Sequence, residues 1–269
     1  MRPGAVPFTE RTPRVAAARR LTRRSRREAE RKFLAEGPQA VREALAGGYA
    51  EAVYGTPEAI ARHAGLVSDA EAAGVAVSPV TESAMAGLSE TVSPQGLVAV
   101  CGFLDVPLPD VLATGPRLVA VLAEIRDPGN AGTVLRTADA AGTAAVVFSD
   151  ASVDPYNGKC VRATAGSLFH PRIVRGGLAR DVIAALRDAG LRVLAADGGG
   201  EHDLDDLADS GELAAPTAWL FGNEARGLPG DLAALADARV RIPIHGGAES
   251  LNLAAAAAVC LYASARAQR

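Results

Sequence analysis

Apolar and polar positions along the chain form two kinds of segment: short continuous apolar runs, and longer stretches with helical spacing. Before residue 104 this pattern predicts a small α/β layer. Strands are expected at 33–36, 50–54, 75–78 and 97–103, and helices at 38–46, 57–64, 66–73 and 81–88. Pro38 suits the first turn of the first helix, because a proline there removes no intrahelical hydrogen bond.

A second and larger α/β pattern begins at residue 117. Residues 105–116 contain three prolines and are predicted to be a linker. Strands are expected at 117–125, 144–148, 171–174, 191–195, 217–221 and 239–242. Because these strands are continuous apolar runs, we expect a mostly parallel sheet with helices on both faces. Ligands of such sheets bind beyond the carboxyl ends of the strands.

Composition narrows the class of protein. The chain has 269 residues, of which 49% are hydrophobic, so a sizeable core can form. No apolar run reaches the ~18 residues of a membrane span, and the Arg-rich N-terminus lacks the apolar segment of a signal peptide. Cys101, Cys160 and Cys260 are far apart, which argues against disulfides and a thiolate metal site. We expect a cytoplasmic protein with no metal.

The basic residues are concentrated at the N-terminus. Residues 1–32 hold eleven basic and three acidic residues, whereas the whole chain has a net charge of −3. A basic arm, 1–31, on an acidic body indicates a polyanionic partner, most often nucleic acid, with a solvated tail as the alternative. We expect deletion of the arm to weaken RNA binding and its salt dependence without unfolding the body.

Three polar clusters follow three of the predicted strands. The first, R-D-P-G-N-A-G-T-V-L-R, contains Asn130, predicted to cap the next helix, and Arg136, whose direction is open. The second, G-N-E-A-R-G, contains Gly222, which permits close backbone approach to a ligand, and the polar pair Asn223 and Glu224. An ordinary helix start and an ordinary turn remain the alternatives for these two clusters.

The third cluster, I-P-I-H-G-G-A-E-S-L-N-L, ends the last predicted strand and opens the last helix. Ser250 is predicted to be the N-cap of that helix. Asn252 lies between two leucines, where its amide needs hydrogen-bond partners. The D-G-G-G stretch at 197–200 lacks the rest of a dinucleotide fingerprint, so a nicotinamide-dependent oxidoreductase is only weakly supported.

In this order the three clusters resemble the motifs of the SpoU (TrmH-type) RNA ribose 2′-O-methyltransferases of the SPOUT superfamily. The resemblance covers 117–269 almost end to end. Residues 32–104 are similar to the family's small RNA substrate-binding domain, and the arm is similar to the basic leader of members that act on rRNA. The resemblance implies a trefoil knot in the sheet, a homodimer with a composite active site, and S-adenosylmethionine bound in the knot.

The resemblance also implies roles for individual residues. Backbone groups of Gly222, Ile242 and Leu251 would hold the adenine, with Asn223 and Ser250 also in the cofactor site. No metal is implied, because the methyl donor is already activated.

Four residues are implied in catalysis: Arg136, Asn130, Glu224 and Asn252. A guanidinium does not readily lose its proton, so we expect Arg136 to bind the adjacent phosphate and stabilise developing alkoxide charge. Asn130 would hold its loop or position the ribose, and Glu224 would orient Arg136 or loop amides. Asn252 would fix the last loop against the cofactor.

The expected function is therefore S-adenosylmethionine-dependent 2′-O-methylation of RNA. The two-domain layout and the basic arm favour 23S rRNA over tRNA. A tRNA 2′-O-methyltransferase, a methylase that protects the ribosome from an antibiotic, and a non-catalytic RNA-binding protein that retains the fold stay open as alternatives.

Overall fold

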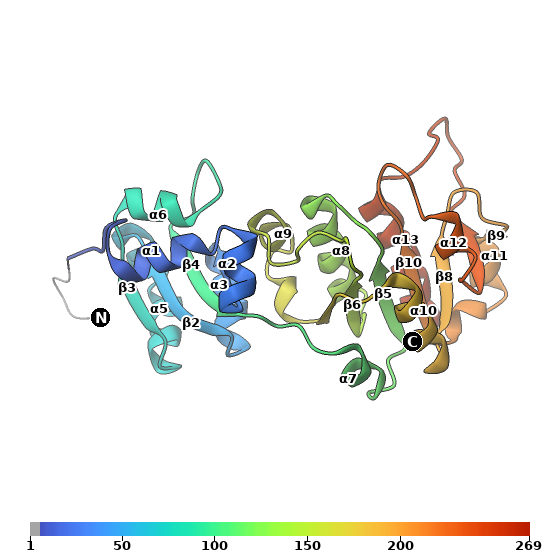
Figure 1. The fold of residues 1–269 in the computed structure, drawn as a ribbon, viewed down its shortest axis with the longest axis horizontal. Coiled ribbons are helices and arrows are strands. Elements are labelled where there is room, and N and C mark those ends of the chain that lie inside the picture. The colour runs from blue at the N-terminus through green and yellow to red at the C-terminus, as the bar shows by residue number, and fades with distance from the viewer. Residues whose placement is uncertain (1–5) are drawn as a thin grey trace. The chain divides into compact units, whose positions relative to one another are not determined.

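A computed structural model describes residues 6–269, which divide into two units (Figure 1). Residues 1–5, which include Arg2 of the basic arm, lie outside the described part of the chain. Unit 1 contains the chain up to Leu104 together with Asp154–Phe169. Unit 2 contains Asp105–Val153 and His170–Arg269. The segment 154–169 therefore belongs with the N-terminal part of the chain, although it lies between strands of unit 2.

Unit 1 is built on a four-stranded sheet in the order β1-β4-β2-β3. The strands are β1 (Lys32–Glu36), β2 (Ala50–Gly55), β3 (Ala76–Pro79) and β4 (Leu97–Gly102). Strand β4 runs antiparallel to β1 and β2, whereas β2 and β3 are parallel. The helices between them are α3 (Pro38–Ala46), α4 (Pro57–Arg62), α5 (Ala64–Ala72) and α6 (Glu82–Leu88). Each lies where the hydrophobic pattern predicts it, within two residues at most ends.

The described part of the basic arm, residues 6–31, is folded rather than a solvated tail. It forms α1 (Pro13–Arg20) and α2 (Arg24–Glu30). Val15, Ala18 and Leu21, spaced by three residues, are buried in one cluster with apolar residues of the sheet and of α6. Deleting the arm would remove part of this core, which argues against the expectation that the body survives the deletion. The arginine content conceals the amphipathic character of α1, whose arginines Arg14, Arg19 and Arg20 all lie on its solvent-facing side.

A buried ion pair ties the arm to the segment 154–169 within unit 1. The Nη2 of Arg27 lies 2.7 Å from Oδ2 of Asp154, and both side chains are only 3% exposed. The same guanidinium donates to the carbonyl oxygens of Leu21 and Thr22 at 3.0 and 2.9 Å. Asp154 in turn accepts from the backbone N–H of Tyr156 at 2.9 Å. The segment, which includes α9 (Gly158–Ala163) and the 3₁₀ turn η1 (Ser167–Phe169), is thereby fixed to unit 1.

Unit 2 contains a seven-stranded sheet in the order β7-β6-β5-β10-β8-β11-β9, with every pair parallel. The strands are β5 (Leu118–Leu122), β6 (Ala145–Phe148), β7 (Arg172–Arg175), β8 (Arg192–Ala196), β9 (His202–Asp203), β10 (Thr217–Phe221) and β11 (Ala238–Arg241). Strand β10 lies between β5 and β8 although it follows both in sequence. The strand order therefore reverses at β5, and the neighbouring carboxyl ends are where ligands of such sheets bind.

Helices cover both faces of this sheet. On one face, α10 (Ala179–Asp188) contributes Ile183 and Leu186 to a core with Val121 and Leu220. Also in unit 2 are α7 (Leu108–Leu112), which lies inside the predicted linker, α11 (Leu204–Asp209), the turn η2 (Glu212–Ala214) and α12 (Gly230–Ala233). None of the helices in the described part of the chain has the length and hydrophobicity needed to span a bilayer.

The other face of the sheet holds α13 (Leu253–Ala267), which also packs against α8 (Pro128–Ala140). The indole of Trp219 on β10 is buried and donates to Oγ of Ser264 at 2.9 Å. Cys260 on α13 is fully buried, and burial raises the pKa of its thiol well above the usual range. It therefore packs as a neutral, apolar side chain. These contacts hold α13 against the sheet.

Candidate functional site

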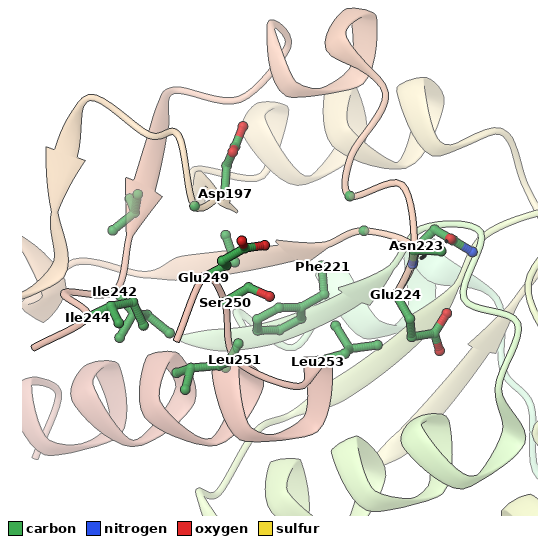
Figure 2. A pocket seen from close by; sticks show the side chains of 17 residues that line it. Asp197, Phe221, Asn223, Glu224, Ile242, Ile244, Glu249, Ser250, Leu251 and Leu253 are labelled. Carbon is green, nitrogen blue, oxygen red and sulfur yellow. Dashed lines mark hydrogen bonds between the residues drawn. The ribbon is translucent and has the colours of Figure 1, made fainter. Parts of the chain in front are cut away.

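A cavity of about 340 Å³ opens at the carboxyl ends of β8, β10 and β11 (Figure 2). Its apolar wall is formed mainly by Phe221, Ile242, Leu251 and Leu253, which come from three separate segments. All five residues predicted to contact the cofactor line it: Gly222, Asn223, Ile242, Ser250 and Leu251. The second and third polar clusters thus meet at one site, although α12 and β11 lie between them in sequence.

Three carboxylates, those of Asp197, Glu224 and Glu249, line the same cavity. None of the described lining residues is Arg, Lys or His. The site therefore complements a ligand with positive charge and a flat apolar part. Sequence reasoning missed Asp197 and Glu249. Asp197 begins the D-G-G-G stretch, which is an incomplete dinucleotide motif, and its position directly after a strand was the available signal.

Gly222 is required by the packing of its own loop. A Cβ there would lie 2.4 Å from the backbone carbon of Gly227 and 2.4 Å from the nitrogen of Leu228. The loop is closed by two bonds, from the Asn223 N–H to the Gly227 carbonyl at 3.0 Å and from the Gly227 N–H to the Asn223 carbonyl at 2.8 Å. The close backbone approach predicted for Gly222 is thus to the loop itself, and it shapes the cavity wall.

A second cavity, of about 600 Å³, shares that wall. Asn223, Glu224, Ala225 and Gly227 line both cavities. The remaining lining residues come mainly from the first polar cluster, after β5: Glu124, Arg126, Asp127 and Asn130, with Arg226 and Pro229 completing it. The loop 222–227 therefore separates an apolar, acidic cavity from a polar one.

A chain of hydrogen bonds joins three of the four predicted catalytic residues. The Nδ2 of Asn252 donates to Oδ1 of Asn130 at 3.2 Å, and the Nδ2 of Asn130 donates to Oε1 of Glu224 at 3.3 Å. Glu224 also accepts from the backbone N–H groups of Asp127 at 3.2 Å and Arg126 at 3.4 Å. The three polar clusters are thus connected, and Glu224 holds two backbone N–H groups of the loop after β5.

The helix caps differ from those predicted. Asn252, not Ser250, is the N-cap of α13, and its Oδ1 accepts from the Ala254 N–H at 2.9 Å. Asp127, not Asn130, caps α8, and its Oδ1 accepts from the Asn130 N–H at 2.8 Å. Both predictions failed for one reason. Several cap-forming residues stand close together, and only the point at which the backbone becomes helical decides between them.

Arg136 lies apart from this set in its own chain. It is exposed on α8 and lines neither cavity. Within residues 6–269 its guanidinium has no hydrogen bond or ion pair, so Glu224 does not orient it in this chain. Arg136 therefore does not join the set formed by Asn130, Glu224 and Asn252 in this chain.

Two family models match successive parts of the chain. Residues 117–262 match the SpoU rRNA Methylase family, and residues 12–99 match an MRM3-like substrate binding domain. The 23S rRNA (guanosine(2553)-2′-O)-methyltransferase RlmP of Bacillus subtilis is 35% identical over 231 residues, which span 86% of this chain and 87% of that relative.

Two solved structures are similar over almost the whole chain. An AdoMet-bound rRNA methyltransferase from Sinorhizobium meliloti has a TM-score of 0.82 at 34% identity and covers 95% of each chain. The SpoU methyltransferase AviRb from Streptomyces viridochromogenes, in complex with the cofactor AdoMet, has a TM-score of 0.82 at 27% identity, over 95% of this chain and 98% of that one.

Proposed function

The chain belongs to the SpoU rRNA methylase family, and we propose that it transfers a methyl group from S-adenosylmethionine to a ribose 2′-oxygen of 23S rRNA. The observation that carries this proposal is the pair of adjoining cavities, with Asn252, Asn130 and Glu224 hydrogen-bonded beside their shared wall. The relative RlmP, named as a 23S rRNA 2′-O-methyltransferase, supports rRNA as the substrate.

The first cavity fits S-adenosylmethionine in size and chemistry. About 340 Å³ lies within the roughly 300–1,000 Å³ of small-molecule sites. Apolar side chains suit the adenine, and backbone groups of Gly222, Ile242 and Leu251 would bond its nitrogens. Asn223 and Ser250 would form the polar edge of the site, and its carboxylates complement the positive charges of the ligand. When bound, S-adenosylmethionine supplies a methyl group already activated by its cationic sulfur.

Arg136 would act in the site of a second copy of the chain. It is exposed on α8, which packs against α13, and α13 exposes Val259 at 42% and Tyr262 at 49%. Exposed large apolar side chains on α13, a helix that packs against α8, support a homodimer in which each active site is composite. Arg136 of the partner subunit would bind the phosphate beside the target ribose and stabilise the developing alkoxide, while the hydroxyl proton leaves to water.

The hydrogen-bonded residues would position this reaction. Asn130 faces the second cavity and would hold the ribose, Glu224 fixes the amides after β5, and Asn252 fixes the start of α13.

We also propose the trefoil knot implied by the family, a cytoplasmic location, and RNA binding by residues 32–104 beside the basic segment 1–31. The matched substrate-binding domain supports the RNA-binding role. Residues 117–269 would form the methyltransferase domain.

Ribose methylation mapped across rRNA, with and without the protein, tests this function directly. We expect one 23S ribose to become methylated, and we expect calorimetry to detect S-adenosylmethionine binding. Transfer to tRNA transcripts instead of 23S rRNA would make the substrate proposal wrong. Absence of S-adenosylmethionine binding would favour a non-catalytic RNA-binding protein.

A further inference from the structure

The second cavity differs from the first in the side chains it presents. Its apolar side chains, among the described lining residues, are only those of Ala225 and Pro229. It therefore offers no broad apolar surface on which a nucleobase could stack. It does contain Arg126 and Arg226, both exposed, and the amide of Asn130. This lining suits a sugar and its phosphates better than a base.

The two arginines are available to bind a ligand. Neither guanidinium forms a hydrogen bond or ion pair in the described part of the chain, although both backbone N–H groups are bonded, to Glu224 and to Asn223. Apart from Arg136, every other arginine between 117 and 241 in unit 2 donates to a carbonyl or pairs with a carboxylate. The unpaired guanidinium groups of this stretch are thus confined to the polar clusters.

Two of the three carboxylates in the same cavity, those of Asp127 and Glu224, accept hydrogen bonds. Asp127 accepts from the Asn130 N–H, and Glu224 accepts from two backbone N–H groups and from the Asn130 amide. The carboxylate of Glu124, the third acid, has no hydrogen bond or ion pair within residues 6–269; only its backbone carbonyl is bonded, to the Asn223 amide at 3.1 Å, so its charge opposes a bound phosphate. Hydrogen bonds donated to a carboxylate weaken its repulsion of a bound phosphate, whereas the two unpaired guanidinium groups keep their full attraction for that phosphate.

We propose that the second cavity binds the sugar-phosphate backbone of the acceptor nucleotide, with Arg126 and Arg226 each bonding a phosphate of the RNA. This inference rests on the proposed function, because it takes the first cavity as the methyl-donor site. The loop 223–227 forms the common wall, so a ribose held beside Asn130 lies next to the donor. Phosphate contacts position a nucleotide without reading its base, so contacts elsewhere in the RNA would select it.

Substitution of the two arginines by glutamine tests this assignment. The variants are Arg126→Gln, Arg226→Gln and the pair together. Arg180→Gln removes one positive charge from an exposed arginine of the same unit and is the matched control. Binding of in vitro transcribed 23S rRNA is measured between 50 and 200 mM salt. S-adenosylmethionine binding by calorimetry and thermal unfolding are measured on the same samples.

We expect each single variant to weaken RNA binding about tenfold, as when a charge-assisted hydrogen bond is removed. The salt slope should fall by about 0.7–0.9 for each phosphate that is no longer bound. S-adenosylmethionine affinity and the unfolding temperature should stay at wild-type values, and Arg180→Gln should change none of the four readouts.

Two results would overturn the inference. One is a double variant with wild-type RNA affinity and salt slope. The other is weaker S-adenosylmethionine binding, which would assign these arginines to the donor. RNA binding does not depend on turnover, so a wild-type protein that binds 23S rRNA without methylating it contradicts the proposed function but not the arginine assignment.

Discussion

The amide of Asn252 has two separate tasks, and substitution can separate them. Its Oδ1 caps α13 by accepting from the Ala254 N–H, and its Nδ2 donates to Asn130. Asn252→Ala removes both bonds. Asn252→Asp keeps a carboxylate oxygen for the cap, where aspartate and asparagine are equally favourable, but presents a second oxygen to Oδ1 of Asn130. If Asn130 turns its amide over, its oxygen then faces Glu224, so one acceptor–acceptor contact remains in either orientation.

The expected sizes of these effects follow from the hydrogen bonds that each substitution removes. Loss of the cap in Asn252→Ala should cost about 1 kcal/mol and lower the unfolding temperature by about 2–4 °C. Asn252→Asp should unfold at about the wild-type temperature. Loss of the amide chain should reduce methyl transfer about tenfold in both variants, since one hydrogen bond contributes about 1 kcal/mol and the positioning of its neighbours adds to this.

A compensating change makes the prediction sharper. In Asn252→Asp combined with Glu224→Gln, Asn130 can reverse its amide, donate to the aspartate and accept from the glutamine, but the glutamine nitrogen then gives up the bond that Oε1 of Glu224 accepts from the Asp127 N–H. We expect the two substitutions to be non-additive in methyl transfer, with a coupling energy of about 1 kcal/mol. The assay follows labelled methyl transfer to 23S rRNA alongside thermal unfolding. Wild-type turnover in Asn252→Asp, or a loss of activity no larger than the loss of stability in Asn252→Ala, would show that Asn252 is only a cap.

Three further predictions concern other parts of the chain. Arg136→Lys should lower turnover at least about tenfold without changing the unfolding temperature, because lysine lacks the paired donors that grip a phosphate; near-wild-type turnover would contradict this role. Gly222→Ala should destabilise the protein by about 2 kcal/mol in denaturant unfolding, because its Cβ meets loop backbone at 2.4 Å, whereas Gly198→Ala, with open space around it, should be neutral. Arg27→Ala should cost about 3–5 kcal/mol by leaving Asp154 buried and unpaired, and equal stability with Arg27→Met plus Asp154→Leu would argue against that cause.

Local signals in the sequence located most of the elements. Continuous apolar runs indicated the strands of both sheets to within a few residues at their ends, because a buried strand needs apolar side chains on both faces. Several elements of unit 2 were not predicted: α10, α11, η2 and α12 were given no bounds, and α7 and β9 were missed for local reasons. The helix α7 is short and lies among prolines, and β9 has only two residues, too few for any pattern. The helical arm was missed because arginine content concealed the spacing of Val15, Ala18 and Leu21.

The residues of the candidate site could be predicted from the sequence, but the hydrogen bonds between them could not. The five predicted cofactor residues line one cavity, and Asn130, Glu224 and Asn252 form one hydrogen-bonded set. No local pattern indicates that Asn252 pairs with Asn130 and not with another polar group. The second cavity and its two arginines were also absent from the sequence predictions, because an arginine in a turn is ordinary until its lack of a partner is visible.

By itself, the sequence determined which segments are strands and helices and which residue types are available after each strand, since these depend on side chains a few positions apart. Only the tertiary structure decided that β10 lies between β5 and β8, that residues 154–169 belong with unit 1, and that Asn252 rather than Ser250 caps α13. The physical reason is the distance along the chain over which each kind of signal acts. Propensity and hydrophobic spacing act within one or two turns, whereas Asn252 meets Asn130 across more than a hundred residues only because α13 and α8 pack together beside the sheet.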